Sequence, residues 1–236
     1  MLFVGRQSEK KKIMEALNGG KNIILSGKFG IGRTRLINEI AKRSNERKFV
    51  FVDFSQTPGK MSEKIIKALG IPRRLKNQTK QMGYKSMRCR IANTNTAKGH
   101  KPVIVFDNIA KVTAQKKIFL RHLILEQHYQ FIAVVENFLP QKDLFDLKAQ
   151  LMPATTLNLR HLKQQDVENL LRGYVAQNHL NWKENYIHHL ASLSDGYPLG
   201  LKEMLIKKGN PRKQKKDLKK NYRENMLIIM LCNDLL

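Results

Sequence analysis

The sequence predicts an α/β domain, in which helices flank a parallel sheet, followed by a small domain made only of helices. Up to about residue 160, short apolar runs alternate with amphipathic segments, which is typical of parallel strands joined by helices. After that point three helical segments follow one another without a strand between them. We therefore expect domains over residues 1–160 and 161–208, and a basic tail or the start of a further segment over 209–236.

The expected strands are short apolar runs, most of them rich in β-branched residues and bounded by polar ones. Strands are expected over residues 22–25, 48–54, 101–108 and 130–137, and the short segment 155–159 could form a fifth.

The expected helices have apolar residues that recur at helical spacing. In the first helix Ile13, Met14 and Leu17 share one face, and the third helix ends at Gly70, with Pro72 just beyond it. In the α/β domain we expect helices over residues 7–17, 34–44, 62–70 and 116–127, and in the second domain over 163–178, 183–194 and 199–208.

The composition limits the classes of protein to which the chain can belong. Its 236 residues are 42% hydrophobic, which favours a buried core over wholesale disorder. The 44 Lys and Arg residues outnumber the 19 Asp and Glu residues, which gives a formal net charge of +25. A charge of this size favours a polyanionic partner, nucleic acid first and an anionic membrane surface second. The alternative is a basic surface that is simply solvated.

Cysteine use and apolar runs bear on the location of the protein. The two cysteines, Cys89 and Cys232, lie far apart and in no C-x-x-C pattern, which suits a reducing compartment and argues against a disulfide framework or a zinc site. The first residues lack the apolar run of a signal peptide, and the run 226–232 is too short to span a bilayer. We expect a soluble, intracellular, cytoplasmic protein without a membrane partner.

The segment GKFGIGRT, residues 27–34, matches a phosphate-binding loop except at one position. The template G-x-x-x-x-G-K-[ST] places glycines at Gly27 and Gly32, and a hydroxyl for Mg²⁺ at Thr34. The loop follows an apolar strand and begins a helix, so its backbone N–H groups and the helix N-terminus would face the same anion. The alternative is a glycine-rich turn with no ligand.

Arg33 stands where the template has lysine. Lysine acts there as a compact charge between the β- and γ-phosphates, whereas arginine is longer and planar, so the two are not interchangeable. Arg33 could attract a triphosphate or lean outward, and Lys28 within the loop could supply charge. Phosphate binding is therefore expected, but fast hydrolysis does not follow.

Polar residues end two of the later strands. Asp107 follows four apolar residues, where it could hold Mg²⁺ directly or through water, and Asn108 stands where an ATPase usually has glutamate. Asn108 can orient a water but cannot accept its proton. At the end of the next strand we favour Asn137 over Glu136 as the residue that reaches the γ-phosphate. The alternative is that these residues only cap turns.

Taken in order, these segments resemble the AAA+ superfamily of P-loop ATPases, in the branch of replication initiators, transposon regulators and STAND-type ATPases. The resemblance covers residues 3 to about 206, and the order of the motifs is more specific than any one of them. FVGRQSEKKKIMEAL is similar to the adenine-contacting box, GKFGIGRT to Walker A, VIVFDN to Walker B and FIAVVEN to the sensor-1 strand, while LRHLKQQDVENLLRGYV and LSDGYPLGL resemble the helical lid.

This resemblance implies the cofactors ATP (or ADP) and Mg²⁺. Thr34 and Asp107 would hold the metal, and Asp107, Asn108 and Asn137 would surround the reacting phosphate. Lys148 stands where an arginine finger would be expected, and Leu199 stands where initiator lids carry a sensor-2 arginine. The residues that would contact the nucleotide are Val4, Gly5 and Arg6 with Pro198 near the adenine, and Gly27, Lys28, Gly30, Ile31, Gly32, Arg33, Thr34 and Arg35 in and beside the loop.

A long basic segment precedes the Walker B strand. Residues 64–101 contain eleven Lys or Arg and no Asp or Glu, and they lack the interleaved aromatic residues that stack bases. Phosphate contacts to DNA are therefore favoured, as in the resembled branch, and a solvated face is the alternative. The residues expected to contact nucleic acid are Arg73, Arg74, Lys76, Lys80, Lys85, Arg88 and Arg90.

The sequence thus predicts an ATP-binding protein that associates with DNA and acts as a nucleotide-dependent regulator or assembly factor of the replication-initiation or transposition type. Hydrolysis would be weak or absent, and homo- or hetero-oligomers could form through the AAA+ interface. Two alternatives stay open: an active, DNA-stimulated ATPase, and a signalling or scaffold module that binds protein and not nucleic acid. Whether the chain is an enzyme is not decided by the residues.

Overall fold

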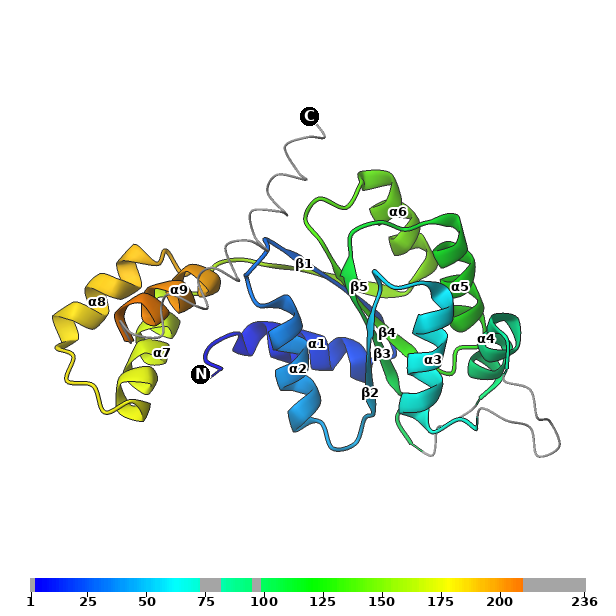
Figure 1. The fold of residues 1–236 in the computed structure, drawn as a ribbon, viewed down its shortest axis with the longest axis horizontal. Helices are drawn as coiled ribbons and strands as arrows, with labels where there is room; N and C mark the ends of the chain where they lie inside the picture. Colours follow the sequence, from blue (N-terminus) through cyan, green and yellow to red (C-terminus); the bar gives the residue numbers. More distant parts are fainter. Residues whose placement is uncertain (1–2, 73–81, 95–98, 210–236) are drawn as a thin grey trace. The chain divides into compact units, whose positions relative to one another are not determined.

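The computed structural model describes residues 3–72, 82–94 and 99–209 (Figure 1). These residues fall into two compact units, which divide between His161 and Leu162. The α/β prediction for the first unit is confirmed, and the second unit is helical in the part that the structure describes.

The first unit is built on a five-stranded sheet in which every pairing is parallel. The strand order is β2-β3-β4-β1-β5, so β1 lies between β4 and β5 rather than beside β2. The carboxyl ends of all five strands therefore lie along one edge, which is where ligands bind in open α/β sheets. The strands are β1 (Asn22–Gly27), β2 (Phe49–Asp53), β3 (Val103–Ile109), β4 (Gln130–Val135) and β5 (Ala154–Leu159).

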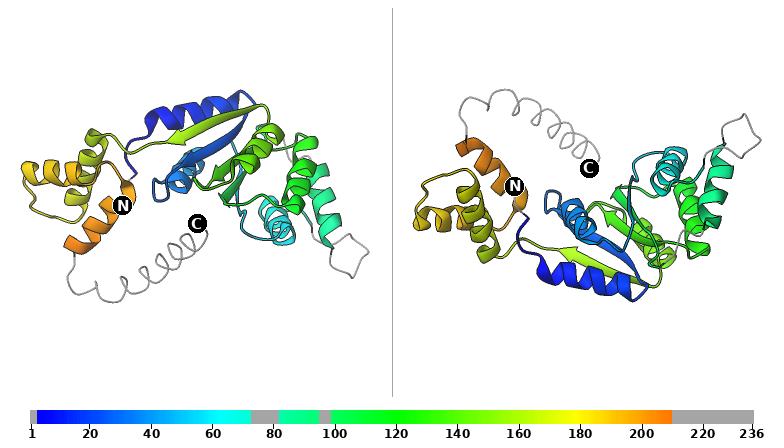
Figure 2. Two further views of the ribbon diagram at one scale, coloured as in Figure 1. Left: turned by 90° about the horizontal axis from the view of Figure 1, so that it is seen from above. Right: turned by 90° about the horizontal axis from the view of Figure 1, so that it is seen from below.

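Helices cover both faces of the sheet, as Figure 1 shows. One face carries α3, α4 and α5, and the opposite face carries α1 and α2; Figure 2 shows α1 beside β1 and β5, which it contacts. The helices of this unit are α1 (Gln7–Asn18), α2 (Arg33–Arg43), α3 (Pro58–Leu69), α4 (Tyr84–Asn93), α5 (Ala114–Leu125) and α6 (Gln141–Gln150).

Phe106 on β3 is at the centre of the core beneath α3, α4 and α5. Its ring stacks on Phe131 of β4 at a centroid distance of 6.0 Å, and it meets Phe54 and Phe119 edge-on at 5.4 and 6.3 Å. All four rings are buried, and such ring pairs stabilise by roughly 0.5–1.5 kcal/mol beyond their buried area. This core fixes β3 and β4 beside each other, and with them the polar residues at the strand ends.

Two helices were not expected from the sequence. α4 lies within the basic segment and buries only Met87, Ile91 and Ala92, and α6 fully buries only Leu147. So few core residues give a weak periodic signal in short helices. In addition, α3 begins at Pro58, four residues before the expected start, because Thr57 caps it by accepting the Lys60 N–H.

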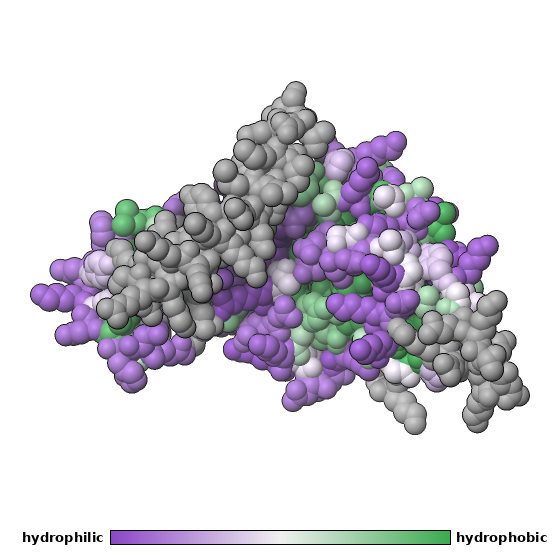
Figure 3. Space-filling view, in the orientation of Figure 1, coloured by the Kyte–Doolittle hydropathy of each residue, from purple (hydrophilic) through white to green (hydrophobic). Residues whose placement is uncertain are grey.

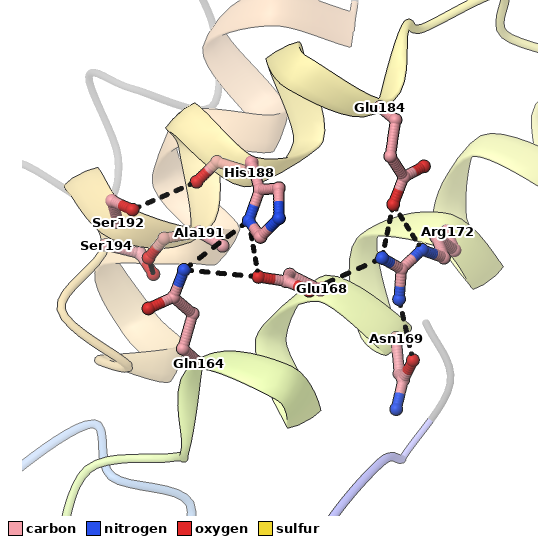
Figure 4. A network of polar contacts seen from close by, with 9 residues as sticks. All are labelled: Gln164, Glu168, Asn169, Arg172, Glu184, His188, Ala191, Ser192 and Ser194. Atoms are coloured by element: carbon pink, nitrogen blue, oxygen red, sulfur yellow. Dashed lines mark hydrogen bonds and ion pairs between the residues drawn. The ribbon is translucent and has the colours of Figure 1, made fainter.

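The second unit contains α7 (Gln164–Gln177), α8 (Glu184–Leu193) and α9 (Pro198–Gly209). A network of polar contacts joins α7 to α8 around the buried carboxylate of Glu168 (Figure 4). This carboxylate accepts hydrogen bonds from Gln164 and Arg172 at 3.2 and 3.3 Å, and His188 Nδ1 lies 2.7 Å from it. Arg172 also donates through Nε to Glu184 at 2.7 Å, which ties the start of α8 to α7.

Hydrophilic residues cover most of the described part of the face drawn in Figure 3. Among the described residues, no helix is both long and apolar enough to cross a membrane.

Candidate phosphate-binding site

The loop between β1 and α2 has the backbone of an anion-binding turn. Gly30 and Gly32 adopt positive φ angles of 74° and 92°, and Gly32 directly precedes α2 without offering a side-chain cap to its first N–H groups. Because those N–H groups have no intrahelical acceptor, they are donors for an anion at the helix N-terminus. A Cβ on Gly32 would meet no atom within 4 Å, so the space beside this residue is open.

Gly27, the first glycine of the loop, is required by close packing. A Cβ at this position would lie 3.0 Å from Cγ2 of Ile31 and 3.0 Å from the carbonyl oxygen of Leu159 on β5. The chain therefore turns away from β1 in direct contact with the neighbouring strand, and these short distances together with a φ of +151° favour glycine at this position.

Arg6 joins the N-terminal segment to the loop. It is buried, and its Nη2 donates a hydrogen bond of 3.3 Å to the carbonyl of Ile31 while its Nη1 lies 2.9 Å from Glu9. Gly5 is buried and Val4 half-buried next to it. The segment predicted to contact adenine is thus attached to the phosphate loop itself.

Arg33, the residue in place of the usual lysine, turns toward the end of β4. Its Nη1 donates to the carbonyl of Val135, and its Nη2 lies 2.5 Å from Oε2 of Glu136. The exposed fractions of the two charged side chains are 7% and 12%, so this ion pair is largely buried. The guanidinium is therefore bound to a protein carboxylate at the position where lysine would contact phosphate.

Thr34 and Asp107 meet at the edge of the sheet. The Thr34 hydroxyl donates to Oδ1 of Asp107 at 3.0 Å, and the same oxygen accepts the N–H of Asn108 at 3.1 Å. Mg²⁺ is held in proteins by one or two such oxygens together with water and phosphate oxygens. A hydroxyl and a carboxylate beside a helix N-terminus therefore fit an Mg²⁺-phosphate group. The exception is Arg33, which binds Glu136 where a P-loop lysine would contact phosphate.

Burial raises the pKa of the Asp107 carboxyl above its ordinary value, while its hydrogen bonds from Thr34 and Asn108 and the charge of Arg33 act in the opposite direction. The negative charge of Glu136 adds to the increase. The side chain is thus easier to protonate in the folded protein than in the unfolded chain.

The structure adds Asp53 to the residues that the sequence suggested. Asp53 ends β2 and pairs in register with Asp107, and its Oδ1 lies 3.4 Å from Nδ2 of Asn108. Burial alone would raise the pKa of Asp53, but its hydrogen bonds, among them those from Ser55 and Asn108, together lower this pKa below its ordinary value. The only sequence signal for this residue was its position at the end of a strand. The pairing of β2 with β3 places it beside Asp107 and so at the candidate site.

The other residues suggested by the sequence lie in several places. Lys28 and Arg35 are exposed in and just after the loop, and Arg35 lies over the ring of Phe3 at 5.8 Å. Asn137 is exposed, whereas Glu136, the less favoured candidate, is the residue that contacts Arg33. Pro198 begins α9 in the second unit, so its place beside adenine stays a prediction.

Three of the seven residues expected to contact nucleic acid lie on α4. Lys85 is exposed, Arg88 lies over the ring of Tyr84 at 5.5 Å, and Arg90 is half-buried. The other four lie outside the described residues: Arg73, Arg74, Lys76 and Lys80.

The raised pKa of Asp107 predicts a pH-dependent stability difference. An acid whose pKa is higher in the folded state contributes stability below its unfolded pKa of about 3.9, and loses it as the pH rises through the folded pKa. Without ligand, Asp107→Asn should therefore gain stability relative to the wild type as the pH rises above about 4. Urea unfolding of both proteins across this range measures the difference, and a difference that does not change with pH would contradict the prediction.

The strand order, the loop between β1 and α2, and the Asp107 carboxylate near the end of β3 together give the chain the fold of a P-loop NTPase. A scan against models of known protein families gives no match, and neither does a search of curated proteins.

Solved structures do match. The ORC1 protein of Aeropyrum pernix in complex with DNA is 13% identical, with a TM-score of 0.63 over 85% of this chain and 58% of that protein. A Walker-type ATPase of Pyrococcus abyssi is 16% identical, with a TM-score of 0.63 over 99% of this chain and 75% of that one. The ORC2 protein of A. pernix, in ADPNP-ADP complexes, is 13% identical, with a TM-score of 0.59 over 87% of this chain.

At these identities the likeness shows the fold. The chain spans about three fifths of the length of the two Aeropyrum proteins, 58% of ORC1 and 64% of ORC2.

Proposed function

We propose that this chain is an AAA+-type ATP-binding protein that associates with DNA and acts as a nucleotide-dependent regulator or assembly factor, of the replication-initiation or transposition type. The observation that carries the proposal is the juxtaposition of Thr34 and Asp107, 3.0 Å apart, beside the N-terminus of α2. The phosphates of ATP or ADP would lie against the loop backbone, with Mg²⁺ held by these two side chains. The fold shared with nucleotide complexes of ORC2 supports this assignment.

Hydrolysis would be weak or absent. Asn108 can orient a water molecule but cannot take its proton, and Arg33 is bound to Glu136 rather than free to stabilise charge on the γ-phosphate. The nucleotide would then act through its presence in the site, by favouring one arrangement of the protein over another. Assembly into homo- or hetero-oligomers through the AAA+ interface is part of the same proposal.

Association with DNA is supported by charge. The net charge of +25 suits a polyanion, and Lys85, Arg88 and Arg90 place three cations on one short helix. The fold is shared with an ORC1 protein solved in complex with DNA. Contacts to phosphates would give affinity with little reading of base sequence.

Equilibrium binding of a fluorescent ATP analogue with Mg²⁺, with and without duplex DNA, tests the nucleotide part. We expect Thr34→Ala and Asp107→Ala to weaken binding by roughly tenfold or more, because each removes an oxygen that positions the metal. The controls Thr156→Ala and Asp146→Ala change the same residue types outside the loop and should bind as the wild type does. Absence of binding by the wild type, or equal binding by all five proteins, would overturn the proposal.

The DNA part is tested by the salt dependence of affinity. A plot of log K against log salt concentration should fall with a slope of about −0.9 for each phosphate contacted. Replacing Lys85, Arg88 and Arg90 by glutamine should make the slope shallower, whereas replacing the exposed Lys11, Lys12 and Lys21 should change it less. A flat plot for the wild type would contradict the DNA assignment, and DNA-stimulated turnover of ATP would favour an active ATPase.

A further inference from the structure

The buried ion pair between Arg33 and Glu136 joins two elements that both border the phosphate loop. Arg33 is the first residue of α2, and Glu136 directly follows β4, the strand that lies beside β1. The Nη2–Oε2 distance is 2.5 Å, and Nη1 donates to the carbonyl of Val135, so both ends of the guanidinium fork have acceptors. A charge-assisted pair of this kind is among the stronger hydrogen-bonded contacts in proteins.

The same cation stands where a nucleotide would meet the loop. The residue at position 33 normally reaches the β- and γ-phosphates. The backbone N–H groups of the loop also bind the α- and β-phosphates, so it is the γ-phosphate that depends most on this side chain. For Arg33 to contact that phosphate, its guanidinium must leave Glu136. Glu136 would then be a largely buried carboxylate without its cation, close to a phosphate of the same charge, and both effects oppose binding.

We propose that Glu136 competes with the terminal phosphate for Arg33, so that this site favours a nucleoside diphosphate over a triphosphate. The inference rests on the proposed function, since it concerns the same site. ADP binds to the loop while Arg33 remains on Glu136, and ATP binds with comparable strength only when Glu136 is exchanged for its γ-phosphate. Glu136 is thus a specificity-determining residue, although it lies outside the loop and was the less favoured candidate at the end of β4.

The test compares ADP with ATP, each with Mg²⁺, by calorimetry or by competition against a fluorescent nucleotide. We expect the wild type to bind ADP at least as tightly as ATP. In Glu136→Gln the guanidinium loses its charged partner but keeps an oxygen acceptor of the same shape, so the affinity for ATP should rise about tenfold. The affinity for ADP should change by less than about twofold. Glu39→Gln, which removes the half-buried partner of the exposed Arg43 on the same helix, should change neither.

A second variant keeps the test decisive if Glu136→Gln does not fold. The pair Arg33→Gln with Glu136→Gln removes both buried charges together, so no unpaired charge is left. It should bind ATP and ADP with nearly equal affinity, because neither the cation nor its competitor is present. Thermal unfolding of each variant shows whether it is folded at the temperature of the binding experiment.

The outcomes separate this inference from the proposed function. If the wild type binds ATP more tightly than ADP, or if Glu136→Gln changes both affinities alike, competition by Glu136 is wrong while nucleotide binding stands. If neither nucleotide binds to the wild type, Glu136→Gln or the double variant, the proposed function and this inference both fail.

Discussion

Replacing Gly196 by alanine should unfold the second unit at a much lower denaturant concentration. Gly196 has a φ of +67°, and a Cβ there would lie 2.1 Å from the carbonyl oxygen of Leu162, which is part of the backbone and cannot rotate away. The same two residues share a hydrogen bond from the Leu162 N–H to the Gly196 carbonyl at 2.8 Å. We expect a loss of about 1–2 kcal/mol from the left-handed backbone and about 1–3 kcal/mol more from the overlap.

Tryptophan fluorescence measures this loss directly. Trp182 is the only tryptophan, and it packs beside the rings of Tyr174 and Tyr186 at 6.1 and 5.2 Å within the second unit. Gly70→Ala, followed by circular dichroism because Gly70 lies in the first unit, is the comparison variant, since Gly70 has a φ of +72° but no atom within 4 Å of a Cβ. That variant should show only the backbone cost. Equal losses in the two variants would mean that the contact with Leu162 is not what requires glycine at 196.

Replacing Arg33 by alanine should destabilise the first unit by about 3–5 kcal/mol, the range for breaking one side of a buried ion pair. Glu136 would keep its charge in a site where it is only 12% exposed, and the carbonyl of Val135 would lose its donor. Urea unfolding followed by circular dichroism measures the effect. The arginine thus has a structural role in addition to any contact with a ligand.

Arg43→Ala provides the comparison on the same helix. Arg43 pairs with Glu39 at 2.8 Å, but its side chain is exposed, so its loss should cost only about 0.3–0.5 kcal/mol. The double variant Arg33→Ala with Glu136→Ala should recover part of the loss, because no buried charge remains unpaired. If Arg33→Ala costs no more than Arg43→Ala, the pair with Glu136 does not stabilise the fold.

Much of the architecture could be predicted because its signals are local. The apolar run before Gly27, the glycines of the loop and the polar residue after each buried strand are patterns within about ten residues of sequence. They were enough to predict the α/β fold and to propose Thr34 and Asp107 as ligands of Mg²⁺, since the loop template and the strand before Asp107 are local patterns. The helix α4 was not predicted, because its three buried side chains lie among basic residues and give only a weak helical periodicity of apolar residues.

The direction of Arg33 was decided only by the tertiary structure. Its partners lie more than a hundred residues further along the chain, and they reach it because β4 is inserted beside β1 in the sheet. In the same way Asp53 meets Asn108 because β2 pairs with β3, and Gly196 is required because the backbone of Leu162 passes next to it. The sequence by itself determined which residues could bind a phosphate, since that depends on local backbone and residue type. Whether the charge of such a residue is already paired within the protein depends on the order of the strands. Strand order brings together residues far apart in the sequence, so no local pattern can reveal these pairs.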